Sequence, residues 1–289
     1  MKVCLGRGDP SPPLGRSKTL RGRPKQIILK YIESWATSGG DTGPSNRITL
    51  LRDTNGDGVP DTPSVFLDLL NSPFGVALVD NDLYVANTDA IVKYPYKPGD
   101  TKITAPGEVL TQLPGGPIDH HWTKSLTASP DGTLLYVGVG SNSNITENGM
   151  EAEKNRAAIL EVDRATGRFR IFAGGLRNPN GLTFEPQSGA LWTVVNERDE
   201  IGPDLVPDYM TSVKDGAFYG WPYSYYGQHV DPRVQPQRPD LVAKAVQPDY
   251  ALSSQVAPLG LTCYTGTNLP NPIGTARLSV STGVGTDSN

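Results

Sequence analysis

Residues 124–139, KSLTASPDGTLLYVGV, consist of two short apolar runs on either side of the turn sequence SPDGT. The same plan recurs at residues 73–87, PFGVALVDNDLYVAN, and at residues 180–195, NGLTFEPQSGALWTVV. A fourth copy begins at residues 259–264, LGLTCY. Apolar runs joined by a turn rich in Gly, Pro, Asp and Asn are typical of a β-hairpin. The chain is therefore built on a repeated hairpin module.

The spacing of this module indicates how the hairpins are arranged. Its anchors Val76, Leu126 and Leu182 are 50 and 56 residues apart, and Leu261 follows after 79. A hairpin that repeats every ~40–50 residues is typical of β-propeller blades, in which each sheet buries both faces against its neighbours. The alternative is a β-sandwich whose hairpins only look alike. We predict an all-β fold, an incomplete β-propeller with about four recognisable blades, and an insertion in the long third interval.

The composition agrees with a turn-rich β protein. The 289 residues include 32 Gly, 26 Pro and 12 Tyr, and Gly and Pro mark turns. The formal net charge is −4, from 26 basic and 30 acidic residues, which disfavours a nucleic-acid partner because a polyanion requires a basic surface. Two cysteines are too few for a disulfide framework. No apolar run reaches the ~18 residues of a transmembrane segment.

The two ends of the chain differ from the rest. Residues 1–30 are basic and rich in Pro and Gly, without the apolar core of a signal peptide, so we expect a disordered or non-native segment there. We expect the propeller domain at residues 31–270. Residues 271–289 are interpreted as an irregular tail, with a shifted reading frame as an alternative.

Two of the three histidines, His120 and His121, lie side by side just before an inner strand of the module. Histidine is the usual base near neutral pH. The alternative is a structural role in the loop. Because neighbouring residues of an extended segment point to opposite faces, at most one of the pair is expected to face a given pocket.

Arg177 and Asn178 occupy the equivalent position before the next inner strand. Arg presents a fixed fork of donors for carboxylate or quinone oxygens, and Asn both donates and accepts hydrogen bonds. The alternative is that Asn178-Pro179 is only a turn. Residues 196–204, NERDEIGPD, form an oxygen-rich loop that suits calcium, with a solvated charged loop as the alternative.

A shorter acidic motif at residues 53–58, DTNGDG, matches the start of an EF-hand loop. Position 12 of such a loop is Ser64 here and not Glu, and no helical pattern flanks the motif. We interpret the motif as the turn of a β-hairpin.

From about Asn46 to Pro270 the chain resembles the sorbosone dehydrogenase-like branch of the soluble glucose/sorbosone dehydrogenases. The motifs that carry the resemblance are LLRDTNGDGVPDT, LNSPFGVALV, DLYVANTDAIVKYPY, HHWTKSL, SPDGTLLYVGVGSNSN, GLRNPNGL, NERDEIGPDLVPDYMTSVKDG, FYGWPYSYYGQ and APLGLTCY. The resemblance implies a six-bladed β-propeller that uses pyrroloquinoline quinone (PQQ) and calcium. It further implies oxidation of a sugar or sugar aldehyde, an electron acceptor such as a quinone, cytochrome or dye, and a periplasmic or secreted location.

The resemblance also implies roles for individual residues. His121 is implied as the base that takes the substrate hydroxyl proton, and His120 is the less favoured candidate. Arg177, Asn178 and Lys124 are implied as PQQ contacts. The calcium ligands of the family are largely backbone carbonyls, which by position indicates Asp199 and Glu200.

The chain departs from the family pattern at three places. Gln255 stands where members often have His. Residues 1–30 do not resemble the expected first blade, and residues 271–289 do not continue into the expected last blades. We therefore expect a chain that is truncated or frameshifted at both ends. A calcium-dependent lactonase-like hydrolase and a non-catalytic propeller that binds carbohydrate or a partner remain as alternative functions.

Overall fold

The computed structural model describes residues 2–4, 46–57, 59, 62–202, 204–264 and 277–282. The chain divides into two compact units, Met1–Ser72 and Pro73–Asn289, and each is considered by itself. Most of the end segments 1–30 and 271–289 lies outside the described residues, apart from one strand in each.

The first unit contains a three-stranded antiparallel sheet in the order β1–β2–β3. Its strands are β1 (Lys2–Cys4), β2 (Ile48–Arg52) and β3 (Thr62–Leu67). In the turn between β2 and β3, the backbone N–H of Gly56 donates to Oδ1 of Asp53 at 2.6 Å, and Gly56 has a φ of 81°. A positive φ of this size favours glycine. The hairpin interpretation of the DTNGDG motif is confirmed.

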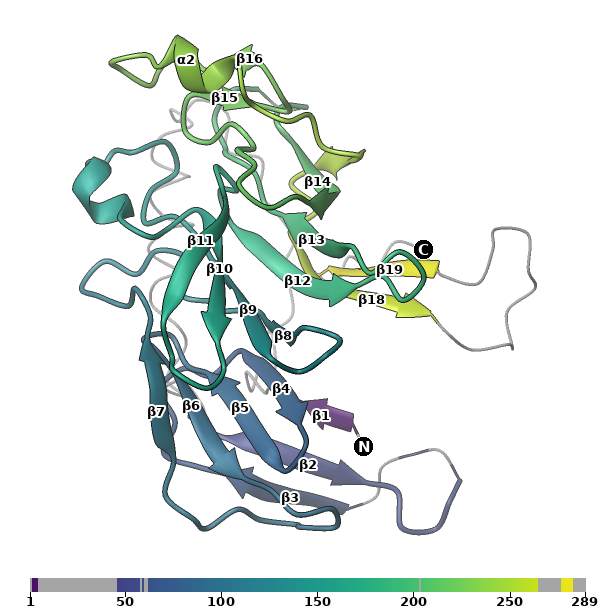
Figure 1. The fold of residues 1–289 in the computed structure, drawn as a ribbon. Helices are drawn as coiled ribbons and strands as arrows, with labels where there is room; N and C mark the ends of the chain where they lie inside the picture. Colours follow the sequence, from purple (N-terminus) through teal and green to yellow (C-terminus); the bar gives the residue numbers. More distant parts are fainter. Residues whose placement is uncertain are drawn as a thin grey trace, which may run out of the picture. The chain divides into compact units, whose positions relative to one another are not determined.

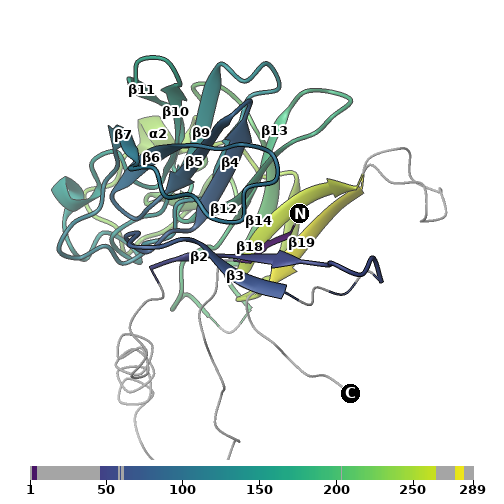
Figure 2. The same cartoon turned by 90° about the horizontal axis from the view of Figure 1, so that it is seen from below.

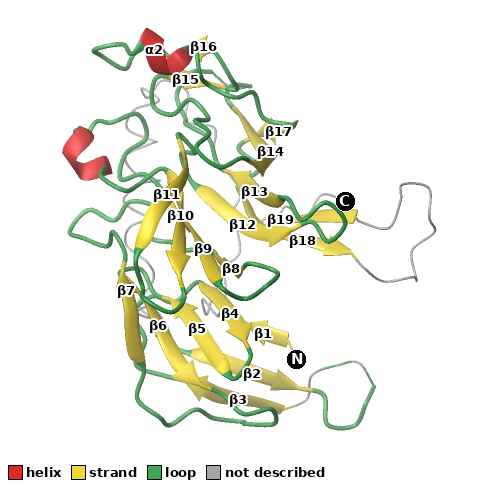
Figure 3. Ribbon diagram, viewed as in Figure 1, coloured by secondary structure: helices red, strands yellow, loops and turns green. Residues whose placement is uncertain are grey.

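The second unit contains three four-stranded antiparallel sheets, which Figures 1 and 3 show as successive groups of arrows. The sheet orders are β4–β5–β6–β7, β8–β9–β10–β11 and β12–β13–β14–β17. The strands of the first sheet are Gly75–Val79, Asp82–Ala86, Ala90–Pro95 and Glu108–Gln112. Those of the second are Leu126–Ala128, Leu134–Val139, Ala158–Asp163 and Phe169–Gly174. Those of the third are Pro179–Phe184, Leu191–Val195, Pro207–Val213 and Tyr250–Ser254.

The three complete hairpin modules predicted from the sequence form the first two strands of the three four-stranded sheets. The fourth copy forms β18 (Pro258–Tyr264), which pairs with β19 (Arg277–Thr282) in a separate two-stranded sheet. Figure 2 shows these two strands side by side. The module therefore marks where each sheet begins.

The third sheet is interrupted by the insertion that the sequence predicts. The chain leaves the sheet at Val213, the end of β14, and returns at Tyr250, the start of β17. Between these points lie β15 (Ser224–Tyr225), β16 (His229–Val230) and the short helix α2 (Pro239–Val242). A single 3₁₀ turn, η1 (Met150–Glu153), lies between β9 and β10. No helix in the described part of the chain combines the length and apolar character that crossing a bilayer requires.

The middle sheet buries both of its faces. From β9, Leu135 and Val137 pack with Tyr84 of the first sheet, whereas the intervening Tyr136 packs with Leu182 of the third. Alternate residues of a strand point to opposite faces, so one apolar strand supplies both cores. A sheet buried on both sides by its sequential neighbours is the arrangement of propeller blades. The predicted β-propeller is confirmed, and a two-sheet sandwich is excluded.

Glycines set the spacing between the first strands of successive sheets. A Cβ at Gly75 of β4 would lie 2.4 Å from the carbonyl oxygen of Lys124, just before β8. A Cβ at Gly181 of β12 would lie 2.5 Å from the backbone nitrogen of Leu261 in β18. Both distances are shorter than any tolerated contact, so these backbones approach each other only because a side chain is missing. The ends of the inner strands are therefore held close together.

Candidate active site

Two predicted segments meet where β8 and β12 begin. The backbone N–H of Ser141 donates to the carbonyl of Arg177 at 2.8 Å. The hydroxyl of Thr123 donates to Oδ1 of Asn180 at 3.0 Å. These bonds connect the loops on either side of the β8–β9 hairpin to the turn that opens β12. The repeat has therefore brought the His-His and Arg-Asn segments to the same end of neighbouring sheets.

His121 is held through its Nδ1 atom. Nδ1 lies 2.7 Å from the carbonyl oxygen of Ser141 and 3.1 Å from its Oγ. A carbonyl oxygen only accepts hydrogen bonds, so Nδ1 carries the proton and Nε2 carries the lone pair. Within the described residues Nε2 has no hydrogen-bond partner. This tautomer leaves Nε2 able to take a proton.

Burial and charge keep His121 neutral. The residue is partly buried. This burial lowers the pKa of His121 well below its usual value, and the neighbouring Arg177 cation lowers it further. His120 by contrast is exposed, with its ring edge-on to that of His121 at a centroid distance of 4.7 Å. Of the two, His121 is the more buried.

Gly140 brings His121 and Asn178 into one site. A Cβ at Gly140 would lie 2.5 Å from Cβ of His121 and 2.4 Å from Oδ1 of Asn178. The two side chains therefore flank a position that only glycine can occupy. Asn178 is buried, and its Oδ1 has no hydrogen-bond partner among the described residues.

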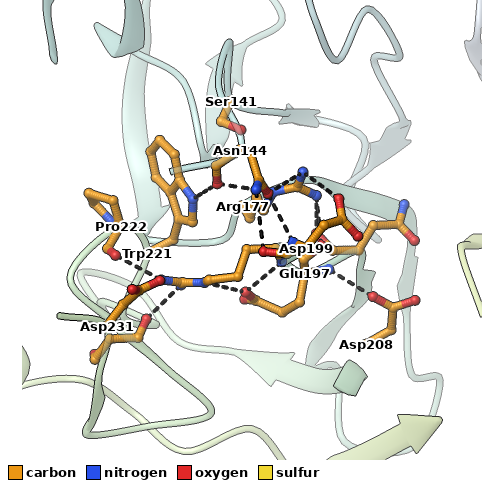
Figure 4. Close-up of polar contacts among 12 residues, drawn as sticks. Ser141, Asn144, Arg177, Glu197, Asp199, Asp208, Trp221, Pro222 and Asp231 are labelled. Atoms are coloured by element: carbon orange, nitrogen blue, oxygen red, sulfur yellow. Dashed lines mark hydrogen bonds and ion pairs between the residues drawn. The ribbon is translucent and has the colours of Figure 1, made fainter. Parts of the chain in front are cut away.

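Arg177 is buried and surrounded by oxygen atoms, as Figure 4 shows. Its Nη1 donates to the carbonyl of Glu197 at 2.8 Å and lies 3.4 Å from that of Asn196. Its Nη2 donates to Oδ1 of Asn144 at 3.0 Å and lies 3.5 Å from Oδ2 of Asp199. Burial lowers the pKa of Arg177, but a guanidinium stays charged in proteins. One fixed cation therefore organises the oxygens of two loops.

The two acidic residues with a predicted calcium role lie in the loop that Arg177 holds. The carbonyl of Asp199 accepts from Nη1 of Arg233 at 3.0 Å and from Nδ2 of Asn144 at 3.4 Å. Glu200 has a φ of 70°, in the left-handed region. Hydrogen-bond donors therefore already contact the Asp199 carbonyl in this structure.

Lys124 lies beneath the loop that carries His121. Its side chain is fully buried, and Nζ donates to the carbonyl of Trp122 at 3.0 Å and lies 3.5 Å from that of His121. Nζ also lies 3.5 Å from Oδ1 of Asp119, which pairs with Arg156 at 2.8 Å. Burial lowers the pKa of Lys124 to about 8, although Asp119 opposes the shift. In this structure Nζ therefore contacts two backbone carbonyls of the loop and the carboxylate of Asp119.

Asn144 is a central residue that the sequence reasoning missed. Besides contacting Arg177, its carbonyl accepts from Nε1 of Trp221 at 2.9 Å, and its Oδ1 accepts from the backbone N–H of Asp199 at 2.9 Å. Its sequence context, Asn-Ile-Thr, indicates only a glycosylation sequon. The contacts join residues far apart along the chain, so no local signal reveals them.

Arg198 is a second residue that sequence reasoning missed. It is almost completely buried, and it donates to the carbonyls of Pro222 and Ser224, each at 2.7 Å. It also pairs with Glu197 at 3.1 Å and with Asp231 at 3.3 Å. Figure 4 labels three of these partners, Glu197, Pro222 and Asp231. The signal available in the sequence was that Arg198 is a basic residue within an acidic loop.

Comparison with known proteins identifies the class. The model of the glucose/sorbosone dehydrogenase family matches residues 79–277, so the chain belongs to this family. Aldose sugar dehydrogenase YliI of Escherichia coli is 23% identical over 184 residues, which cover 59% of this chain and 47% of that protein. The chain spans about half the length of the curated relatives it matches.

Two solved structures share the fold. One is the holo form of the pyranose dehydrogenase PQQ domain from Coprinopsis cinerea, with a TM-score of 0.63, 20% identity and coverage of 78% of this chain and 65% of that one. The other is a calcium structure of a family AA12 carbohydrate-active enzyme from Trichoderma reesei, with a TM-score of 0.64, 17% identity and coverage of 74% and 64%. At these identities the likeness establishes the propeller fold.

The site itself fits a group that supplies hydrogen-bond donors or positive charge. Three buried side-chain oxygens have no partner among the described residues: Oδ1 of Asn178, Oδ1 of Asn196 and Oε1 of Glu197. Asn178 follows Arg177 in sequence, and the backbone carbonyls of Asn196 and Glu197 accept hydrogen bonds from Arg177. A buried oxygen without a partner costs free energy. The described residues contain no cluster of three or more His, Cys, Asp or Glu side chains suited to a metal. A cation here would use mainly backbone and amide oxygens, which calcium accepts.

Proposed function

We propose that this chain contributes to a PQQ-dependent dehydrogenase that oxidises a sugar or sugar aldehyde of the sorbosone type, with His121 as the general base. The observation that best supports this proposal is the hydrogen bonding of His121. Its Nδ1 is hydrogen-bonded to Ser141, while Nε2 has no partner among the described residues. Membership of the glucose/sorbosone dehydrogenase family supports the reaction class.

PQQ and calcium are the proposed cofactors. When bound, PQQ supplies a two-electron acceptor whose reactive carbonyl becomes more electrophilic beside calcium. Arg177 and Asn178 are proposed to contact the quinone, because one is a buried cation and the other has an unpaired buried oxygen. Lys124 is proposed as a third PQQ contact, through its buried Nζ. The carbonyls of Asp199 and Glu200 are proposed as calcium ligands, which requires the metal to compete with Arg233 for Asp199.

The protein's own residues would handle the proton of the reaction. The substrate hydroxyl would give its proton to Nε2 of His121 as the C–H bond of the same carbon is broken and a carbonyl forms. The resulting imidazolium would keep its Nδ1–H bond to the Ser141 carbonyl. General-base catalysis of this kind typically contributes 10²–10⁴-fold to the rate.

The direct test is dye reduction by the chain after addition of PQQ and calcium, with several aldoses and L-sorbosone as substrates. We expect His121→Ala to lower kcat by about 10²–10⁴-fold. His120→Ala is the matched control, because it removes the adjacent, exposed ring, and we expect activity within about 2-fold of the parent.

Other outcomes point to other functions. Equal losses from both histidine variants would overturn His121 as the base. Lactone hydrolysis without PQQ would favour the calcium-dependent hydrolase. Binding of carbohydrate without turnover of any substrate would favour a non-catalytic propeller. The periplasmic or secreted location and a propeller domain at residues 31–270 stay predictions, and fractionation of the native host would test the location.

A further inference from the structure

A chain of hydrogen bonds leads from His121 to a buried carboxylate. The Nδ1–H of His121 is accepted by the carbonyl and Oγ of Ser141. The hydroxyl of Ser141 donates to the carbonyl of Ser143 at 2.6 Å. The hydroxyl of Ser143 donates to Oε1 of Glu153 at 2.5 Å. Ser141 and Ser143, which follow β9, are thus connected by hydrogen bonds to Glu153 of the η1 turn.

The directions of these bonds fix where each proton lies. Because the Ser141 hydroxyl proton is directed to the Ser143 carbonyl, Oγ of Ser141 presents only lone pairs to the imidazole. Because the Ser143 hydroxyl donates to Glu153, it does not compete with the Ser141 hydroxyl for the carbonyl of Ser143. Both groups that face Nδ1 are therefore acceptors, and the ring must carry its proton on Nδ1.

Glu153 is an unusual residue for this place. It is only 6% exposed, and it has no ion-pair partner within the described residues. Its other oxygen, Oε2, accepts from the backbone N–H of Asn142 at 2.8 Å. Burial raises the pKa of Glu153, while these hydrogen bonds oppose the shift. A buried carboxylate is costly unless it is hydrogen-bonded, and the two oxygens of Glu153 accept from Asn142 and Ser143.

We propose that Glu153 is a positioning residue that fixes the tautomer of His121 through Ser143 and Ser141. The inference rests on the proposed function, because the fixed tautomer matters only if Nε2 of His121 is the base. Glu153 would not touch the substrate. It orders the segment whose carbonyl and hydroxyl accept the Nδ1 proton, as a carboxylate does for a catalytic histidine in other enzymes.

The decisive variant is Glu153→Gln. A carboxylate accepts on both oxygens, whereas an amide must present its NH₂ group either to the Ser143 hydroxyl or to the Asn142 N–H. One of the two bonds is therefore replaced by a mismatch at nearly constant volume. Glu151→Gln is the matched control, because it makes the same charge change on an exposed residue of the same turn.

The first readout does not require cofactor or turnover. With ¹⁵N-labelled histidine, the chain's three histidines give few ring signals, and those of His121 are assigned from their loss in His121→Ala. We expect the Nδ1–H form in the parent and in Glu151→Gln, and a mixture of tautomers in Glu153→Gln. An Nε2–H form in the parent, or an unchanged tautomer in Glu153→Gln, would overturn the inference.

The second readout is the kinetics of the PQQ- and calcium-loaded protein. We expect Glu153→Gln to lower kcat by about 10-fold, in the range known for outer partners of functional histidines, with KM nearly unchanged. Ser143→Ala removes the hydrogen bond from Ser143 to Glu153 but leaves the bond from the Asn142 N–H to Glu153. It therefore tests the inference even if Glu153→Gln folds poorly. The double variant, Glu153→Gln with Ser143→Ala, should lower kcat no more than the more severe single variant, because both substitutions remove the same hydrogen-bonded path. Additive losses of kcat would contradict the inference.

Failure of the two proposals can be told apart. If the parent reduces no dye, the proposed function fails while the tautomer measurement still decides the role of Glu153. If the parent is active and the Glu153→Gln tautomer is unchanged, the proposed function stands and the positioning role is rejected.

Discussion

The proposed chemistry depends on one imidazole being neutral. Burial lowers the pKa of His121, and the neighbouring Arg177 cation lowers it further. A base with a lowered pKa is weaker but stays unprotonated at mildly acid pH. If His121 is the general base, as proposed, this arrangement extends activity toward lower pH.

The pH dependence of kcat/KM tests this reading. If His121 is the general base, the unprotonated imidazole is the active form, so activity should fall as pH drops through the pKa of His121, and we expect the midpoint of this acid limb below the usual 6.5. Removing the positive charge in Arg177→Gln should move the histidine's midpoint upward, measured by NMR titration. A midpoint at or above 6.5 in the parent would contradict the expected burial.

Gly140 offers a test of how tightly the site is packed. Gly140→Ala would push its methyl group into Cβ of His121 and Oδ1 of Asn178, and overpacking of this kind typically costs about 1–3 kcal/mol. We expect a similar loss in the free energy of unfolding, measured in urea, together with reduced kcat. Gly174→Ala is the control, because a Cβ there meets no atom within 4 Å; equal effects would argue against the tight contact.

The sequence could indicate some of these residues but not their connections. The repeat placed His121 and Arg177 at equivalent positions before inner strands, and the structure brings their segments together. The roles of Gly140 and Glu153 could not be predicted, because each depends on a contact with a residue in another loop. A glycine after an apolar strand and a Glu in a charged turn look ordinary in sequence.

At the scale of elements, Arg198 joins the acidic loop to the aromatic insertion. Its guanidinium donates to carbonyls of Pro222 and Ser224 and pairs with Glu197 and Asp231. All four contacts lie in the interior, where an ion pair must be well hydrogen-bonded to offset desolvation. The insertion is therefore anchored by one side chain from the loop that also bonds Arg177.

We expect Arg198→Met to be strongly destabilising. It leaves Glu197 buried without its cation, and breaking a buried pair from one side typically costs about 3–5 kcal/mol. Arg238→Met is the control, because that side chain is 49% exposed and its pair with Asp240 lies at the surface, where such pairs contribute little to stability. Denaturant unfolding compares the two variants. Similar losses in the free energy of unfolding would mean that the buried Arg198 network contributes no more to stability than an exposed ion pair.

The elements themselves were the part of the fold best predicted from sequence. The repeat of two apolar runs around a turn identified the hairpins that became β4–β5, β8–β9 and β12–β13. The pairing of β14 with β17 was beyond such reasoning, because the two strands are separated by the whole insertion. Alternation reports which face of a strand is buried, whereas pairing between distant strands depends on tertiary packing.

At the scale of the whole molecule, we expect ligand binding to raise the free energy of unfolding. Buried oxygens of Asn178, Asn196 and Glu197 have no partner among the described residues, and we expect PQQ with calcium to bind the folded state selectively. At ligand concentrations of about 100 times Kd, the expected gain is about 2.7 kcal/mol, seen as a rise in Tm.

A chelator gives the matching control for this thermal shift. Removing calcium with EDTA should abolish most of the rise, whereas His121→Ala should retain it, because that residue is proposed to transfer a proton and not to hold the cofactor. An unchanged Tm with both cofactors present would count against their binding to this chain.

The late return of β17 has a consequence for the order of folding. The first two sheets of the second unit are each made from strands adjacent in sequence, so they close short loops and can form as soon as their residues are available. The third sheet is completed only when the chain comes back at Tyr250 after the excursion that begins beyond Val213. Closing that longer loop costs more entropy. We therefore expect amide protons of β9 and β10 to gain protection from exchange early in refolding, and those of β14 that face β17 to gain it last.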